Sequence, residues 1–438
     1  MPIEVLKQKL KDAPTAPATG RVLAVQAQTI RASLPAARVG DMASIERRGE
    51  PLLAEIVGFG GGEVQLLSLG DPAGIGPNDL VHASGAPLRV AVGDALLGRI
   101  LDGLGRPMDD GPLPAGTRLV PVANTSVAPL KRRPIDEAMP TGIRAIDGLL
   151  SLGRGARVGL FSGPGLGKSR MLGAIARGGS ADVVVVALVG ERGREVREFL
   201  DEVLDEASRK NAVIVVATAD APPLERLRAV EVASAIAEHF RDEGRHVMLL
   251  VDSLTRVARA QREVGLACGE PPARRGYPPS VFALLPKLLE RSGQGSTGSI
   301  TAFFTVLVEG DDLDEPIADE VRGLLDGHIV LSRELASRGV FPAIDIPRSL
   351  SRLMPRLVNS EQQHAASQLR ALMADYDSKR DLISLGAYSE GSDPRTDRAL
   401  RAHAALTKFL CQGDDGVSWD DSLREVLALA KRYGSAEG

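Results

Sequence analysis

The stretch Arg157-Val-Gly-Leu-Phe-Ser-Gly-Pro-Gly-Leu-Gly-Lys-Ser169 decides the fold of this 438-residue chain. It reads as a buried strand, a glycine-rich loop and the start of a helix. The backbone N–H groups of such a loop surround phosphates, Lys168 reaches the β- and γ-phosphates, and the Ser169 hydroxyl holds Mg²⁺. The positive end of the helix favours the same anions. The residues expected to contact a nucleotide here are Gly163, Pro164, Gly165, Leu166, Gly167, Lys168 and Ser169.

The bulk composition is that of a globular protein with two or three domains. Hydrophobic residues make up 44% of the chain, and the net charge of −4 provides no overall basic field for nucleic acid. The two cysteines, Cys268 and Cys411, form neither a disulfide framework nor a zinc pattern, and we expect both to be small buried residues in a reducing cytoplasm. No apolar run reaches the roughly 18 residues of a membrane span, and the first residues lack a signal-peptide core.

Changes of pattern along the chain predict a tail and a first domain. Residues 1–19 form the tail, in which residues 3–13 are either a helical docking peptide or a frayed terminus. Short apolar runs separated by Gly, Pro and Asp turns predict a small β-barrel over residues 20–87. Its one aromatic residue, Phe59, offers too little stacking surface for nucleic acid, so we interpret the barrel as an assembly unit.

Two further domains follow the barrel. Residues 88–353 alternate continuous apolar runs with helical segments, which is typical of an α/β domain with a parallel sheet covered on both faces. Residues 354–438 lose this pattern and predict a helical domain. The expected strands after the phosphate loop are 182–190, 212–218, 246–252 and 299–308, and the expected C-terminal helices are 361–381, 397–411 and 420–433.

Two carboxylates come at the ends of predicted strands, where parallel sheets bind their ligands. Asp252 ends an apolar strand and is placed to hold the water shell of the Mg²⁺ that Ser169 contacts. Glu191 follows another strand. It is either the group that orients and polarises an attacking water near the γ-phosphate or a solvated charge that opens a helix.

Several longer motifs carry a family resemblance. The chain from about residue 20 to 435 resembles the catalytic subunits of rotary and secretion ATPases, and is most similar to the type III export ATPases of flagella and injectisomes. The motifs are Gly190-Glu-Arg-Gly-Arg-Glu-Val196, Asp252-Ser-Leu-Thr-Arg256, Gly269-Glu-Pro-Pro272, Arg275-Gly-Tyr-Pro-Pro-Ser-Val-Phe282, Val308-Glu-Gly-Asp-Asp-Leu-Asp-Glu-Pro-Ile-Ala-Asp-Glu-Val321 and Pro342-Ala-Ile-Asp-Ile-Pro-Arg-Ser-Leu-Ser351.

The resemblance implies a β-barrel, a RecA-like P-loop NTPase core and a helical C-terminal domain, assembled as a homohexamer with ATP and Mg²⁺ at the subunit interfaces. Carried over by position, it implies phosphate and metal binding by Lys168 and Ser169, a role on the attacking water for Glu191, and metal support by Asp252.

Five further residues receive roles from the resemblance alone. Arg192 and Arg256 organise the site, and Arg352 is the arginine finger that reaches the γ-phosphate of the neighbouring subunit. Phe341 stacks on adenine or packs in the core, and Phe409 closes the other side of that pocket.

The chain departs from the family at two positions of the phosphate loop. Ser162 stands where the family usually has Ala or Gly, and Pro164 stiffens the middle of the loop. Gly163, Gly165 and Gly167 remain, so we expect the loop still to accept phosphate. The two substitutions bear on the fine geometry of the loop and therefore on the rate, which needs to be measured.

The function that the resemblance implies is ATP hydrolysis by a ring that docks and releases export substrates and chaperones. Its implied partners also include a stator protein at the N-terminus and the membrane-embedded export apparatus, with the protein in the cytoplasm and peripheral at the inner membrane. The alternatives are a rotary ATP synthase catalytic subunit, an RNA-translocating hexameric helicase and a non-catalytic binding module. The aromatic-poor barrel disfavours RNA, and Lys168, Glu191 and Arg352 in one chain favour the export ATPase.

Overall fold

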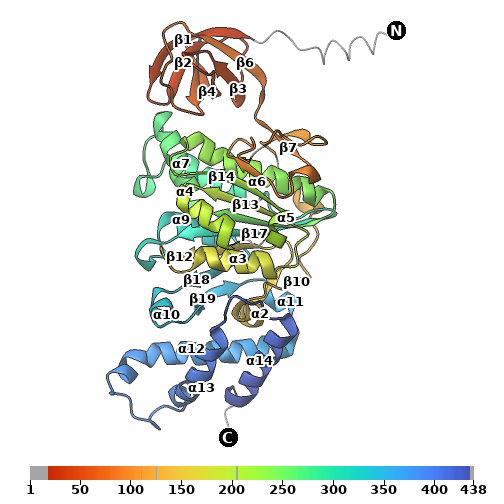
Figure 1. The fold of residues 1–438 in the computed structure, drawn as a ribbon. Coiled ribbons are helices and arrows are strands. Elements are labelled where there is room, and N and C mark those ends of the chain that lie inside the picture. The colour runs from red at the N-terminus through yellow and green to blue at the C-terminus, as the bar shows by residue number, and fades with distance from the viewer. Residues whose placement is uncertain (1–17, 110, 125, 204–205, 435–438) are drawn as a thin grey trace.

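The computed structural model describes residues 18–109, 111–124, 126–203 and 206–434. Figure 1 shows three parts stacked along one direction: a barrel at the N-terminal end, an α/β core in the middle and helices at the C-terminal end. The fold class predicted from the sequence is thereby confirmed. The expected helix over residues 3–13 lies outside the described residues.

The N-terminal part is a closed antiparallel barrel with the strand order β1-β2-β5-β4-β3-β6. Alternate side chains point inward, and Ile30, Ile45, Ile56 and Leu66 fill the interior. Closure leaves no free strand edge. The strands are β1 Thr19–Gln26, β2 Thr29–Ser33, β3 Asp41–Ile45, β4 Leu52–Gly60, β5 Glu63–Ser68 and β6 Leu80–Pro87.

A buried ion pair joins the barrel to the core. Glu55 on β4 accepts a hydrogen bond of 2.8 Å from Nε of Arg228 on α6 (Pro223–Asp242). Arg228 also pairs with Glu231 one turn further along the same helix. Because both ends of the contact are largely shielded from water, losing either partner would leave a buried charge unpaired.

The core is built on a nine-stranded sheet with the order β19-β18-β12-β17-β15-β13-β14-β8, to which β16 pairs through β17. The expected parallel pairing is confirmed from β18 to β8, while β19 runs antiparallel at the edge. The sequence did not predict β8, β16, β18 or β19 of this sheet. The strands are β8 Ile100–Asp102, β12 Arg157–Ser162, β13 Val183–Val189, β14 Ala212–Ala217, β15 His246–Asp252, β16 Gly293–Gln294, β17 Ser299–Leu307, β18 Gly327–Leu331 and β19 Ile344–Ser351.

Helices cover both faces of this sheet, as the continuous apolar strands predict. Along β13, Val183 and Val185 belong to one core and Val184 and Val186 to the other, because successive side chains point to opposite faces. The helices of this region, besides α6, are α2 Arg144–Leu149, α3 Lys168–Gly178, α4 Gly193–Glu198 with its π-helical continuation Phe199–Val203, α5 Glu206–Lys210, α7 Leu254–Ala267, α8 Pro279–Leu289, α9 Pro316–Leu324, α10 Arg333–Ser337 and α11 Met354–Leu357.

Small two-stranded sheets connect these parts, formed by β7 (Arg89–Val92) with β9 (Arg118–Pro121) and by β10 (Ala138–Met139) with β11 (Leu152–Gly153). Cys268 and Cys411 are free thiols. Both are only partly buried, which corrects the expectation of full burial, and both pack against the core. Within the described ranges, no helix combines the length and the apolar character that a bilayer crossing requires.

The C-terminal part consists of α12 Ser360–Ser384, α13 Pro394–Leu410 and α14 Trp419–Tyr433, which confirms the three predicted helices. Each begins at a side-chain cap, from Asn359, Asp393 and Ser418 respectively. The connection between α13 and α14, residues 411–418, turns back onto the core. There the Gln412 N–H donates to the Phe341 carbonyl at 2.8 Å.

Candidate functional site

The phosphate loop joins the C-terminal end of β12 to the first turn of α3. Strand β12 lies inside the sheet, between β17 and β18, so the loop opens at the edge where parallel strands bind ligands. Gly165 and Gly167 have φ angles of 77° and 81°, in the left-handed region that favours glycine. Helix α3 then begins at Lys168, with its free N–H groups directed at the loop.

The two unusual loop residues avoid these demanding positions. Ser162 is the last residue of β12 and is buried, and among the described residues its hydroxyl has no hydrogen-bond partner. Pro164 is exposed on the loop surface. The two left-handed positions therefore keep glycine.

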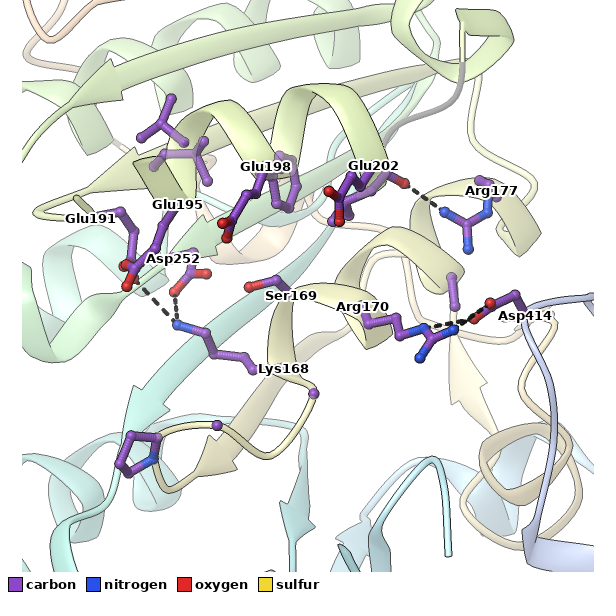
Figure 2. Close-up of a pocket in the computed structure, with 18 of the residues that line it drawn as sticks. Lys168, Ser169, Arg170, Arg177, Glu191, Glu195, Glu198, Glu202, Asp252 and Asp414 are labelled. Atoms are coloured by element: carbon purple, nitrogen blue, oxygen red, sulfur yellow. Dashed lines mark hydrogen bonds and ion pairs between the residues drawn. The ribbon is translucent and has the colours of Figure 1, made fainter. Parts of the chain in front are cut away.

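A cavity of about 1220 Å³ opens in front of the loop. The loop and α3 form one wall, and three glutamates of the α4 region, Glu195, Glu198 and Glu202, line the opposite wall (Figure 2). Glu191 and Asp252 stand at one end. The segment 412–416 contributes the other end, so the C-terminal domain is part of the site.

A compact cluster of opposite charges surrounds Lys168. Its Nζ lies 2.5 Å from Oδ1 of Asp252 and 3.3 Å from Oε1 of Glu191 (Figure 2). Arg256 approaches the other oxygen of Glu191 at 2.9 Å. The hydroxyl of Thr305 on β17 donates to Asp252 Oδ1 at 2.8 Å. Strands β12, β13, β15 and β17 therefore bring the lysine, both acids and their supporting groups within contact distance.

The surroundings of the Glu191 carboxyl favour its neutral, protonated form. Burial raises its pKa to about 7, and a hydrogen bond to Glu195 acts in the same direction, while Lys168 and Arg256 oppose the shift. The same hydrogen bond lowers the pKa of Glu195. A base with a pKa near the working pH combines a large ionised fraction with a useful affinity for a proton. Glu191 therefore has the properties of a general base for water.

The oxygen atoms beside the loop fit a nucleotide-bound Mg²⁺. The Ser169 hydroxyl and the Asp252 carboxylate both line the cavity, and hard oxygen ligands suit this ion. Among the residues that the structure describes, no cluster of three or more His, Cys, Asp or Glu forms a metal site by itself. One hydroxyl and one carboxylate suit a metal held mainly by substrate phosphates and water.

The other predicted residues lie outside this cavity. Arg192 caps α4 and is exposed, with its guanidinium 3.8 Å from Glu195. Arg352 follows β19 on the exposed surface of the core. Phe341 is 47% exposed and lies beside the cavity residue Gln412. Phe409 is only 2% exposed and packs in the core, with the Arg144 guanidinium 5.4 Å from its ring centroid.

Sequence reasoning missed several groups that the fold adds. Thr305 supports Asp252, Glu195 tunes Glu191, and Asp414 brings the C-terminal domain to the cavity. Glu195 belongs to the Gly190–Val196 motif, so its place four residues after Glu191 could have marked it as a neighbour of that carboxyl. The other two come from strands and loops far along the chain, and no local pattern marks them.

The comparisons with known proteins agree with this geometry. Residues 142–351 match the nucleotide-binding domain of the ATP synthase alpha/beta family, and residues 358–428 match the T3SS EscN ATPase C-terminal domain. The chain is 48% identical to the flagellum-specific ATP synthase of Bacillus subtilis over 94% of each chain. It is 47% identical to the type 3 secretion system ATPase of Xanthomonas euvesicatoria over 93% of each chain.

A solved structure extends the likeness to three dimensions. The assembled ATPase EscN of the enteropathogenic Escherichia coli type III secretion system has a TM-score of 0.89 and 45% identity, covering 94% of this chain and 99% of EscN. Similarity of this extent includes the barrel, the core and the C-terminal helices. The chain therefore belongs to the type III secretion and flagellar export ATPases of the ATP synthase alpha/beta family.

Proposed function

We propose that this protein hydrolyses ATP as a homohexameric ring and thereby energises type III protein export, in a flagellum or an injectisome. The observation that carries the proposal is the cluster of Lys168, Asp252, Glu191 and Arg256 around the phosphate loop. It contains a cation for the phosphates, a buried acid beside the metal position and a base of near-neutral pKa.

The chemistry follows from these contacts. ATP binding draws Lys168 from its two carboxylate partners to the β- and γ-phosphates, because the phosphates carry more negative charge. Its departure frees one oxygen of Glu191, while Arg256 holds the other. The freed oxygen accepts a proton from the water that attacks the γ-phosphate. The bond from the γ-phosphorus to the β–γ bridging oxygen breaks, and ADP leaves. Ser169 and Asp252 would hold a Mg²⁺ that arrives with the nucleotide, and this ion would neutralise part of the phosphate charge.

The charge that develops on the γ-phosphate needs a further cation. We assign this role to Arg352 of the neighbouring subunit, since Arg352 is exposed and lies outside the cavity of its own chain. A head-to-tail contact of this kind forms a ring when its rotation closes. EscN has been solved in an assembled state, also in complex with its central stalk EscO, which supports a ring and a stalk-like partner for this chain.

The remaining assignments follow the same proposal. Residues 20–87 form the assembly barrel, residues 88–353 the ATPase core and residues 354–438 the helical domain. Arg192 orders the opening of α4, and Phe341 flanks the base, whereas Phe409 is buried in the core and does not reach it. We place the protein in the cytoplasm, peripheral at the inner membrane, where it meets export chaperones, secreted substrates and the export apparatus.

Mixing two inactive variants tests the shared site directly. Glu191→Gln removes the base, Arg352→Ala removes the finger, and each protein alone should be inactive. In a 1:1 mixture about one interface in four combines an intact Glu191 with an intact Arg352, so phosphate release should partly recover. A mixture no more active than its components would refute the shared site. Export itself is tested by protein secretion in cells that carry the Glu191→Gln variant, where normal secretion would contradict the proposal.

A further inference from the structure

The nucleotide cavity continues well beyond the charge cluster. Glu191 and Asp252 mark the end where the γ-phosphate reacts, and the phosphate loop holds the chain of phosphates. The nucleoside must therefore extend the other way, past the first turn of α3. That end of the cavity is lined by Arg170, Gln412 and Asp414, among others.

Arg170 and Asp414 form a two-pronged ion pair at this end. Nε and Nη2 of Arg170 lie 2.9 and 2.6 Å from the two carboxylate oxygens of Asp414 (Figure 2). The arginine belongs to α3, directly after the metal-binding serine, and the aspartate to the segment that connects α13 and α14. The hydrogen bond from Arg170 lowers the pKa of Asp414, so the pair stays charged at neutral pH.

The segment that carries Asp414 is itself tied to the core. The Gln412 amide donates to the carbonyls of Gly142 at 2.7 Å and Asp415 at 3.0 Å, and accepts from the Arg144 N–H at 2.9 Å. The Val417 N–H also donates to the Gly142 carbonyl at 3.0 Å. Asp414 therefore presents its carboxylate to Arg170 from an anchored segment.

Stability of the fold gives little reason for this pair. Its two side chains are 75% and 60% exposed, and ion pairs so open to water contribute little to folding. The fork geometry has another consequence. A carboxylate that engages one edge of a guanidinium fixes its plane and leaves both faces free, and arginine faces stack on flat rings.

We propose that Arg170, oriented by Asp414, is the surface on which the nucleobase stacks, so that this pair sets the affinity for the nucleoside rather than for the phosphates. The proposal rests on the ATPase function and adds a specificity residue to it. Phe341 adjoins the same segment through Gln412. Stacking recognises a ring face and not its edge groups, so ATP and GTP should depend on Arg170 alike.

Binding measurements with three probes separate the nucleoside from the phosphates. Wild type, Arg170→Ala and Arg170→Lys are titrated calorimetrically with ATP, GTP and inorganic tripolyphosphate, each with Mg²⁺. We expect Arg170→Ala to bind ATP and GTP about five- to tenfold more weakly, with tripolyphosphate affinity unchanged within about twofold. Arg170→Lys should resemble Arg170→Ala, because lysine keeps the charge but lacks the flat face.

A second variant and a matched control complete the design. Asp414→Ala should weaken ATP binding in the same direction but less, because the guanidinium remains and loses only its orientation. Arg424→Ala removes an arginine that is also 75% exposed and pairs with Asp421 on α14, away from the cavity. Its ATP affinity should equal that of the wild type.

Several results would overturn the assignment. If Arg170→Ala lost affinity for tripolyphosphate as much as for ATP, Arg170 would be a phosphate ligand. If Arg170→Lys kept full ATP affinity, the positive charge alone would account for the effect, without stacking. Unchanged ATP binding by Arg170→Ala, with a wild type that binds ATP, would refute this proposal alone. A wild type that binds no ATP would refute the ATPase function and this proposal with it.

Discussion

We expect the Glu191→Gln protein to bind ATP and to lose nearly all turnover. Glutamine has the shape of glutamate, so the side chain still fills its buried place between Lys168 and Arg256. It carries no charge and cannot accept a proton from water. A positioned general base contributes roughly 10²- to 10⁴-fold in rate, which corresponds to about 2.7 to 5.5 kcal/mol in the activation barrier.

The same structure predicts little cost in stability. Burial raises the pKa of Glu191, so the folded protein disfavours its charged form, and an uncharged glutamine avoids this penalty at pH 8. Lys168 keeps its contact of 2.5 Å with Asp252. The melting temperature of the variant should therefore equal or exceed that of the wild type, and loss of activity should not reflect unfolding.

The assay compares kcat from phosphate release, ATP affinity from calorimetry and the melting temperature. Glu55→Gln is the matched control, since Glu55 is also 8% exposed and paired with an arginine, but lies between barrel and core. It should keep kcat, because Glu55 does not line the nucleotide cavity. A Glu191→Gln kcat within about threefold of the wild type would refute the role of the base. A variant that lost ATP binding in proportion to turnover would refute it equally.

Three more substitutions probe the site. Lys168→Ala removes a charge-assisted contact to phosphate, so we expect calorimetry to show ATP binding about 10- to 100-fold weaker. Unchanged affinity would refute phosphate binding by Lys168. Arg352→Ala should keep its fold and its ATP affinity while kcat falls by roughly 10³- to 10⁵-fold. A fall of less than about tenfold would refute the assignment of Arg352 as the arginine finger. Glu195→Ala removes the hydrogen bond that raises the pKa of Glu191. Because Glu191 acts in its ionised form, kcat/KM of the wild type should rise as pH increases through about 7. In the variant the pKa of Glu191 is lower, so the rise should occur at lower pH. An identical profile would show that Glu195 does not affect the pKa of Glu191.

Much of the fold was predictable because it follows from local patterns. Continuous apolar runs such as that of β13 predict strands buried on both faces, and the spacing of apolar residues predicts the C-terminal helices. Strands β18 and β19, at one end of the sheet, escaped prediction. They carry polar residues such as His328 and Arg348, and only pairing with β12 and with each other makes them strands.

The sequence by itself determined the phosphate loop, because its shape depends on the φ angles of neighbouring residues and on glycine at Gly165 and Gly167. Tertiary structure alone decided the rest of the site. Lys168 meets Asp252 across 84 residues of chain, and Arg170 meets Asp414 across 244. Such contacts form only when packing of the sheet and closure of long chain segments bring the groups together, so no short stretch of sequence encodes their distances.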